Sequence, residues 1–165
     1  MNIKGAAIYS HQSAVLAAVL ALGACAGFHK ADKVSPNDAN LNSTWHASIA
    51  SPTQLAGAVQ MSGSASMAPG TKRGTTEVVI KLGNSSPGGL HPWSLHRGRC
   101  GADEGMLGTF DDYSPLKVRA NGTADSHAVV KLDTPATGEF FVSVQASIMN
   151  RELIVGCGNL APPTT

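Results

Sequence analysis

Residues 90–100, LHPWSLHRGRC, contain the densest group of chemically versatile side chains in the 165-residue chain. The imidazoles of His91 and His96 could bind a metal ion, and Cys100 could form a disulfide or, beside two arginines, a reactive thiolate. If this segment is a strand, Ser94 and His96 lie on the same face. Ser94 lacks the G-x-S-x-G setting of a hydrolase nucleophile, and the sequence identifies no acid partner for it.

The three cysteines, Cys25, Cys100 and Cys157, differ in their surroundings. Residues 13–25, SAVLAAVLALGAC, are apolar but shorter than the roughly 20 residues of a membrane-spanning helix, which is typical of an export signal. Its end, LGAC, resembles the bacterial lipobox, which implies cleavage before Cys25 and lipidation of its thiol. The alternative is an ordinary secretory signal with an unrelated cysteine.

Export would place the rest of the chain in an oxidising compartment, where the remaining pair, Cys100 and Cys157, is expected to form one disulfide. A metal site built on these two cysteines is the alternative, but neither belongs to a C-x-x-C or C-x-x-H pair. We therefore predict a signal peptide at 1–24, a flexible tether at 25–43, a β domain at 44–160 and a tail at 161–165. The expected location is the periplasmic side of the bacterial cell envelope, with the outer membrane preferred over the inner.

The charge balance argues against a nucleic-acid partner. Lysine and arginine total 12, aspartate and glutamate total 11, and no basic run occurs. Membrane attachment would therefore come from the lipid on Cys25. Asp103, Glu104, Asp111 and Asp112 are expected to form a solvated acidic loop rather than a site for a hard cation.

Short alternating segments predict an all-β domain with about eight strands. In residues 44–50, Trp45, Ala47 and Ile49 share one face, and residues 75–82 and 139–147 alternate in the same way. We also expect a long strand over 56–69, a loop over 101–115, and a hairpin of 116–120 with 123–132 around Asn121-Gly122. Such strands bury one face each, which favours an antiparallel sandwich or barrel.

The segments GLHPWSLHRGRC, residues 89–100, and IVGCGNL, residues 154–160, resemble those of the copper/zinc superoxide dismutase family. Gly89, Leu90 and His91 match the start of that family's metal-binding strand, and His96 matches its last histidine. The resemblance implies an eight-stranded Greek-key barrel, a disulfide between Cys100 and Cys157, metals bound outside the barrel wall, and a hydrogen-bonding role for His91.

The sequence departs from the family at the residues that hold metal. Ser94 replaces the first histidine of the copper pair, and Gln145 replaces the last copper histidine. Residues 100–115 contain no histidine, so the bridging and zinc-binding residues have no counterpart, and Ile154 replaces the active-site arginine. Because copper needs several imidazoles to cycle between its oxidation states, the site is expected to be degraded.

We therefore predict a superoxide dismutase-like lipoprotein domain with a non-catalytic binding or structural role, no cofactor, and a protein or small ligand as partner. The same parity that places Ser94 and His96 on one face lets Gln145 converge with them. The alternative is a copper-dependent dismutase or periplasmic copper carrier that uses His96 with His91, His46 or His127. The empty loop after Cys100 argues against zinc in either case.

Overall fold

The computed structural model describes residues 43–55, 57–58 and 60–163 of the chain. The expected signal peptide, the lipidation site Cys25, nearly all of the tether and the last two residues of the tail lie outside these ranges. Within the described residues, no helix is long and apolar enough to cross a membrane.

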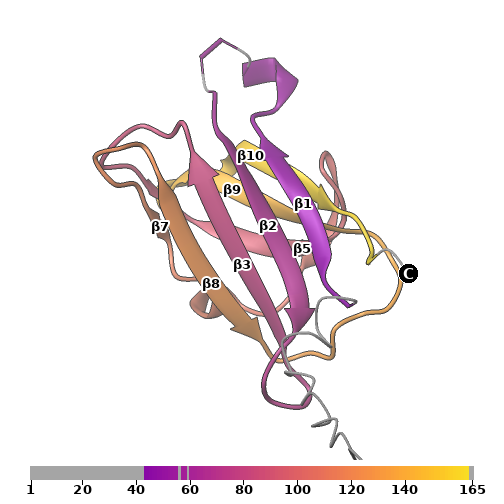
Figure 1. The fold of residues 1–165 in the computed structure, drawn as a ribbon. Coiled ribbons are helices and arrows are strands. Elements are labelled where there is room, and N and C mark those ends of the chain that lie inside the picture. The colour runs from indigo at the N-terminus through magenta and orange to yellow at the C-terminus, as the bar shows by residue number, and fades with distance from the viewer. Residues whose placement is uncertain (1–42, 56, 59, 164–165) are drawn as a thin grey trace, which may run out of the picture. The chain divides into compact units, whose positions relative to one another are not determined.

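The described residues fold into strands joined by turns and two short 3₁₀ helices (Figure 1). The strands are β1 (Trp45–Ala50), β2 (Ser62–Pro69), β3 (Thr76–Gly83), β4 (Leu90–His91), β5 (Trp93–Arg99), β6 (Ala102–Met106), β7 (Leu116–Lys117), β8 (Ala124–Val130), β9 (Phe140–Ser147) and β10 (Asn150–Leu160). The 3₁₀ helices are η1 (Thr53–Leu55) and η2 (Phe110–Asp112). The fold class is therefore all-β, as the alternating sequence predicts.

Eight strands form one curled antiparallel sheet in the order β6-β5-β9-β10-β1-β2-β3-β8, and β4 pairs with β7 separately. In Figure 1, β1, β2, β3 and β8 form one layer, and β5, β9 and β10 cross behind it. Strands β1, β2 and β3 follow one another, whereas β10 lies beside β1 and β8 beside β3. These long-range neighbours are Greek-key connections.

Alternation of apolar and polar residues determines which face of each strand is buried. In β1, Trp45, Ala47 and Ile49 are buried and their neighbours exposed, and β3 buries Val78 and Ile80 in the same way. The side chains of Trp45 and Trp93 lie in the core, where each is 1% exposed. Full burial of large apolar side chains stabilises the fold by about 1.5–3 kcal/mol each.

Strand β9 differs from the other strands because both of its faces are covered. Its inward residues include Val142 and Val144, while Phe141, Ser143 and Gln145 on the opposite face are also buried. Burial of polar side chains requires hydrogen-bond partners. The outer face of β9 is therefore where a functional site is to be sought.

Three local expectations need correction. Residues 101–115 are not only a loop, because 102–106 form the edge strand β6. Its side chains are mostly exposed, so they give no alternation of buried and exposed residues. The strand expected over 56–69 begins only at Ser62. Asn121-Gly122 does form a tight turn, closed by Gly122 N–H to Arg119 O at 2.9 Å, but β7 pairs with β4 rather than with β8.

Candidate functional site

Five polar residues from three neighbouring strands meet on the outer face of the sheet. Ser94 and His96 come from β5, Asp103 from β6, and Ser143 and Gln145 from β9. The strand register places Ser94 directly opposite Ser143 across the β5–β9 pairing. We call these five residues the polar cluster.

A chain of hydrogen bonds runs through the cluster. The Ser94 hydroxyl lies 2.8 Å from His96 Nε2, and His96 Nδ1 lies 2.9 Å from Asp103 Oδ1. An ionised carboxylate only accepts hydrogen bonds, so Nδ1 carries the ring proton and Nε2 of the neutral ring accepts the proton of Ser94. Both ring nitrogens of His96 are thus engaged.

Asp103 is an ionised acceptor in this arrangement. Partial burial would raise the pKa of its carboxyl group, but hydrogen bonds from the Gly105 backbone N–H and from His96, together with the electrostatic attraction between His96 and the carboxylate, lower it below its usual value. The Gly105 N–H donates at 2.7 Å to Asp103 Oδ1, the same oxygen that accepts the hydrogen bond from His96 Nδ1. The carboxylate is therefore fixed in orientation as well as in charge.

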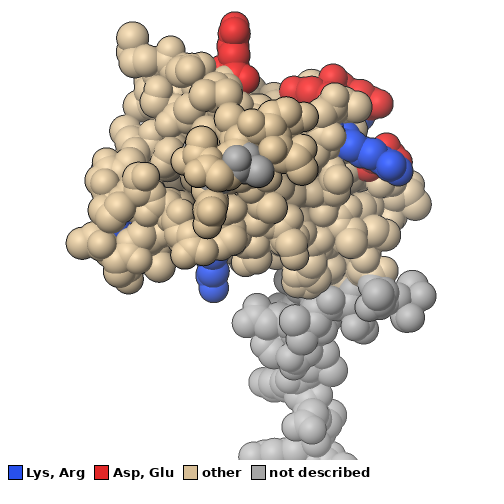
Figure 2. All heavy atoms as spheres, turned by 90° about the horizontal axis from the view of Figure 1, so that it is seen from above, with Lys and Arg blue, Asp and Glu red and all other residues tan. Residues whose placement is uncertain are grey.

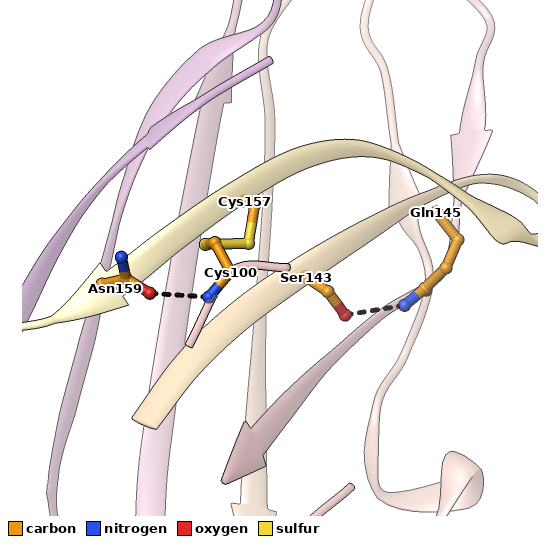
Figure 3. Close-up of a disulfide and its surroundings, with 5 residues drawn as sticks. All are labelled: Cys100, Ser143, Gln145, Cys157 and Asn159. Carbon is orange, nitrogen blue, oxygen red and sulfur yellow. Dashed lines mark hydrogen bonds between the residues drawn. A yellow bond between two sulfur atoms is a disulfide. The ribbon is translucent and has the colours of Figure 1, made fainter. Parts of the chain in front are cut away.

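Gln145 completes the cluster and leaves one polar atom unpaired. Its Nε2 donates to Ser143 Oγ at 2.9 Å, and lies 3.4 Å from Ser94 Oγ. Its Oε1 is buried without a hydrogen-bond partner, and the residue is 4% exposed. A buried acceptor without a donor costs about 1–3 kcal/mol. Figure 3 shows Gln145 and Ser143 side by side on β9, near the disulfide.

Two contacts hold the imidazoles in place around the cluster. The ring of Phe141 stacks on His96, with centroids 5.0 Å apart and an angle of 27° between the planes. His91 Nδ1 donates to the backbone oxygen of Gln145 at 3.1 Å, so this ring ties β4 to β9. His91 thereby makes a hydrogen bond to the strand without joining the side-chain network.

The other histidines of the described chain lie elsewhere. His46 lies beside a separate surface hollow bordered by Ser64, Ser66 and Lys81. His127 is exposed on β8, opposite Val79. Across the described residues, no three side chains among histidine, cysteine, aspartate and glutamate are grouped in a way that could hold a metal ion.

The disulfide expected between Cys100 and Cys157 is formed, with an S–S distance of 2.02 Å (Figure 3). It joins the turn between β5 and β6 to β10, and the Cys100 N–H also donates to Asn159 Oδ1 at 2.8 Å. Asp103 follows three residues after this attachment. The disulfide therefore helps to hold β6, and with it the carboxylate of the cluster, against the wall of the sheet.

A cleft of about 690 Å³ borders the cluster and the disulfide. On the side of the cluster, the cleft is lined by Asp103, Phe141 and Ser143. Ile154 of β10 also lines it and is the strand partner of Gln145 on β9. Its remaining polar side chains are uncharged and come from Ser48, Ser51, Thr53, Gln54 and Asn159. Figure 2 shows a face of the molecule that carries few charged residues, which lie at its edges, with acidic and basic side chains side by side at one of them.

Sequence reasoning identified Ser94, His96 and Gln145 as residues that converge, but it missed Asp103 as their partner. Asp103 was expected in a solvated acidic loop, and its side chain is indeed 53% exposed. The turn that brings it back to His96 depends on glycines at positive φ, Gly98 (95°) and Gly101 (86°). Glycine adopts this conformation readily, so the G-R-C-G spacing was the available signal for a tight hairpin.

Comparison of the sequence with protein-family models and with curated proteins finds no match. The function is therefore inferred from the contacts of the polar cluster and from the cleft beside it.

Proposed function

We propose that this chain is a lipid-anchored protein of the bacterial cell envelope, with a superoxide dismutase-like β domain that binds a ligand instead of removing superoxide. Two features support the likeness to that family: the Greek-key order of the strands, and the disulfide that joins the turn after β5 to the last strand. The lipobox-like LGAC sequence supports the anchor at Cys25.

The observation that carries the proposal is the state of His96. Its two ring nitrogens are 2.8 Å from Ser94 Oγ and 2.9 Å from Asp103 Oδ1, so a metal at either nitrogen would have to displace one of these partners. The side chains beside it offer a neutral hydroxyl and an amide. Copper cycling between its two oxidation states requires several nitrogen or sulfur donors, and these residues do not fit such a site.

His91 does not supply the missing imidazole. Its Nδ1 is bonded to the backbone of β9, and its Nε2 faces the backbone at Gly89, where a Cβ atom would lie only 2.8 Å away. Zinc fits no better, because a closed zinc site needs four ligands of the histidine, cysteine or carboxylate type. No redox step is therefore assigned to this cluster.

The cleft is the surface that supports a binding role. Its lining combines hydroxyl and amide groups with the apolar surfaces of Phe141 and Ile154, and Asp103 supplies its one charged side chain. Such a lining suits a small uncharged molecule that carries hydroxyl or carbonyl groups, since an anion would be repelled by Asp103.

Copper titration of the full-length protein tests the proposal. We expect no tight 1:1 site that depends on His96, so calorimetric titrations of the unsubstituted protein and of His96→Ala should be alike. One copper per chain, bound below micromolar Kd and lost in His96→Ala, would restore the copper-protein alternative. A His127→Ala control separates surface histidine binding from binding at the cluster.

Ligand binding is measured separately by NMR, with a panel of uncharged polyols and glycosides as probes. We expect shifts of the backbone amides of Ser143, Asp103 and Asn159, which border the cleft. The amides of Ser64 and Ser66, beside the hollow at His46, serve as the internal control. Shifts of equal size at both places would contradict a specific site in the cleft.

A further inference from the structure

We propose that Ser94 is a nucleophile for small uncharged esters, activated by His96 and Asp103. This goes beyond the binding role, because it assigns a reaction to the polar cluster. The contacts are those of a serine–histidine–acid triad: the hydroxyl to Nε2 at 2.8 Å, and Nδ1 to the carboxylate at 2.9 Å. Such triads are recognised by geometry and role, and they occur on unrelated folds in different chain orders.

The direction of each hydrogen bond suits proton transfer away from Ser94. Asp103 fixes the Nδ1–H form of the ring, which leaves the lone pair of Nε2 directed at the Ser94 hydroxyl. Stacking on Phe141 restrains the ring plane. The carboxylate is itself oriented by the Gly105 N–H. Nucleophile, base and orienting acid are thus all in place before a substrate enters.

Gln145 controls access to the nucleophile, because Ser94 is fully buried in the closed arrangement. The Gln145 amide is held there by one good hydrogen bond, at 2.9 Å to Ser143, and by a long contact of 3.4 Å to Ser94. Its Oε1 gains no hydrogen bond in this position. Outward rotation of the side chain would break the bond to Ser143 but would let water hydrate Oε1, so opening costs little.

The cleft identifies the substrate class. It borders Ser143 and Ile154, the neighbours of Gln145 on β9 and β10, so a molecule bound there lies next to the opening that Gln145 would leave. Asp103 disfavours anionic substrates, and the surrounding hydroxyl and amide groups suit an uncharged ester.

The reaction balances with water as the only co-reactant. Ser94 Oγ attacks the ester carbonyl, its proton passes to His96 Nε2, and the alcohol leaves with that proton, which yields an acyl-serine. Water then attacks the acyl group and gives its proton to Nε2. Ser94 leaves with that proton, and the carboxylic acid is released. Asp103 stays ionised throughout and stabilises the charged imidazole.

The test uses the full-length protein with p-nitrophenyl acetate as substrate and a fluorophosphonate as covalent probe. We expect a mass increase on the peptide that contains Ser94, and release of p-nitrophenol that Ser94→Ala abolishes. Ser64→Ala is the control, because this exposed serine on β2 borders the separate hollow at His46 and lies outside the polar cluster and the cleft; it should keep the activity. Circular dichroism and thermal melting verify that each variant is folded.

Two further variants examine the roles of the neighbouring residues. Gln145→Ala should accelerate labelling about tenfold, the order expected from loss of one neutral hydrogen bond that keeps the site closed. Asp103→Asn should slow it at least a hundredfold and change its pH profile, since the histidine loses its orienting anion. Equal labelling rates for Gln145→Ala and the unsubstituted protein would overturn the gating role.

Absence of an adduct on Ser94 in both the unsubstituted protein and Gln145→Ala would overturn the proposal. Ester cleavage that persists unchanged in Ser94→Ala would overturn it as well, because it would come from other groups. The labelling result is independent of the copper and NMR titrations, so failure here leaves the binding role intact.

Discussion

The carboxylate of Asp103 lies 2.9 Å from Nδ1 of His96 and joins the exposed edge strand β6 to the wall of the sheet at β5. The two residues are only seven positions apart, yet a turn with glycines at positive φ is needed to bring them together. The contact fixes the tautomer of His96 and directs its other nitrogen to Ser94. Both ring nitrogens of His96 are therefore hydrogen-bonded, whereas a histidine that binds a metal ion must offer it a free ring nitrogen.

Replacement of Asp103 with asparagine should destabilise the fold modestly, by about 0.5–1 kcal/mol, because the carboxylate is largely exposed. The native carboxyl has a lowered pKa, so its contribution is present above the unfolded value of about 4 and is lost as the pH falls through the lower native value. Urea unfolding at several pH values measures this difference. Glu104→Gln, an exposed neighbour on β6, is the control; an equal effect from it would contradict a specific bond to His96.

Removal of the disulfide by Cys157→Ala should lower the free energy of unfolding by roughly 4 kcal/mol, the chain-entropy value for a loop that separates the cysteines by 57 residues. Chemical denaturation of oxidised protein, reduced protein and the variant provides the comparison. Reduction should bring the unsubstituted protein to the stability of Cys157→Ala. A midpoint that reduction does not move would show that the bridge contributes nothing to stability.

Gly63→Ala should be strongly destabilising, by about 2 kcal/mol or more, because its Cβ atom would lie 2.2 Å from the backbone oxygen of Lys81. Gly83, on the paired strand β3, is the matched control, since a Cβ atom added there would lie 3.9 Å from Ser62 Oγ, an ordinary contact distance. The melting temperatures of the two alanine variants, measured by thermal unfolding, provide the comparison. Similar melting temperatures for the two would mean that β2 and β3 are not as closely paired at Gly63.

Alkaline pH should destabilise the domain through Tyr113. Burial, with the nearby charge of Asp112, raises the pKa of this phenol to about 12. The folded state therefore keeps the proton that the unfolded state releases near pH 10, and stability falls as the pH rises from about 10 to about 12. Tyr113→Phe should remove this part of the pH dependence. In the unsubstituted protein, the absorbance of the phenolate reports the ionisation of Tyr113. An unchanged alkaline profile in the variant would assign the effect to other groups.

The strands that could be predicted from sequence are those with one buried and one exposed face. Alternation in β1 and β3 located Trp45 and Ile80 in the core, and parity put Ser94 and His96 on a common face. The expected convergence of Gln145 with them came from the resemblance to the dismutase family together with parity. The cysteine count was equally informative, because assignment of Cys25 to the lipid leaves Cys100 and Cys157 as a single pair, and the structure joins them.

The remaining features depend on contacts that local sequence does not encode. β6 has exposed side chains, so no pattern distinguished it from a loop, and Asp103 was missed for the same reason. β7 follows a good turn signal but pairs with β4, because Leu116 is fully buried and lies opposite His91. Burial of the outer face of β9 likewise depends on contacts between strands, such as the stacking of His96 on Phe141.

The rate of superoxide removal by the copper-loaded, full-length protein tests the central claim most directly. We expect a rate no higher than that of copper-loaded His96→Ala, far below the diffusional range of about 10⁸–10⁹ M⁻¹s⁻¹, since one engaged imidazole cannot hold a cycling copper ion. A rate in that diffusional range, lost in His96→Ala, would contradict the account and identify the chain as a dismutase.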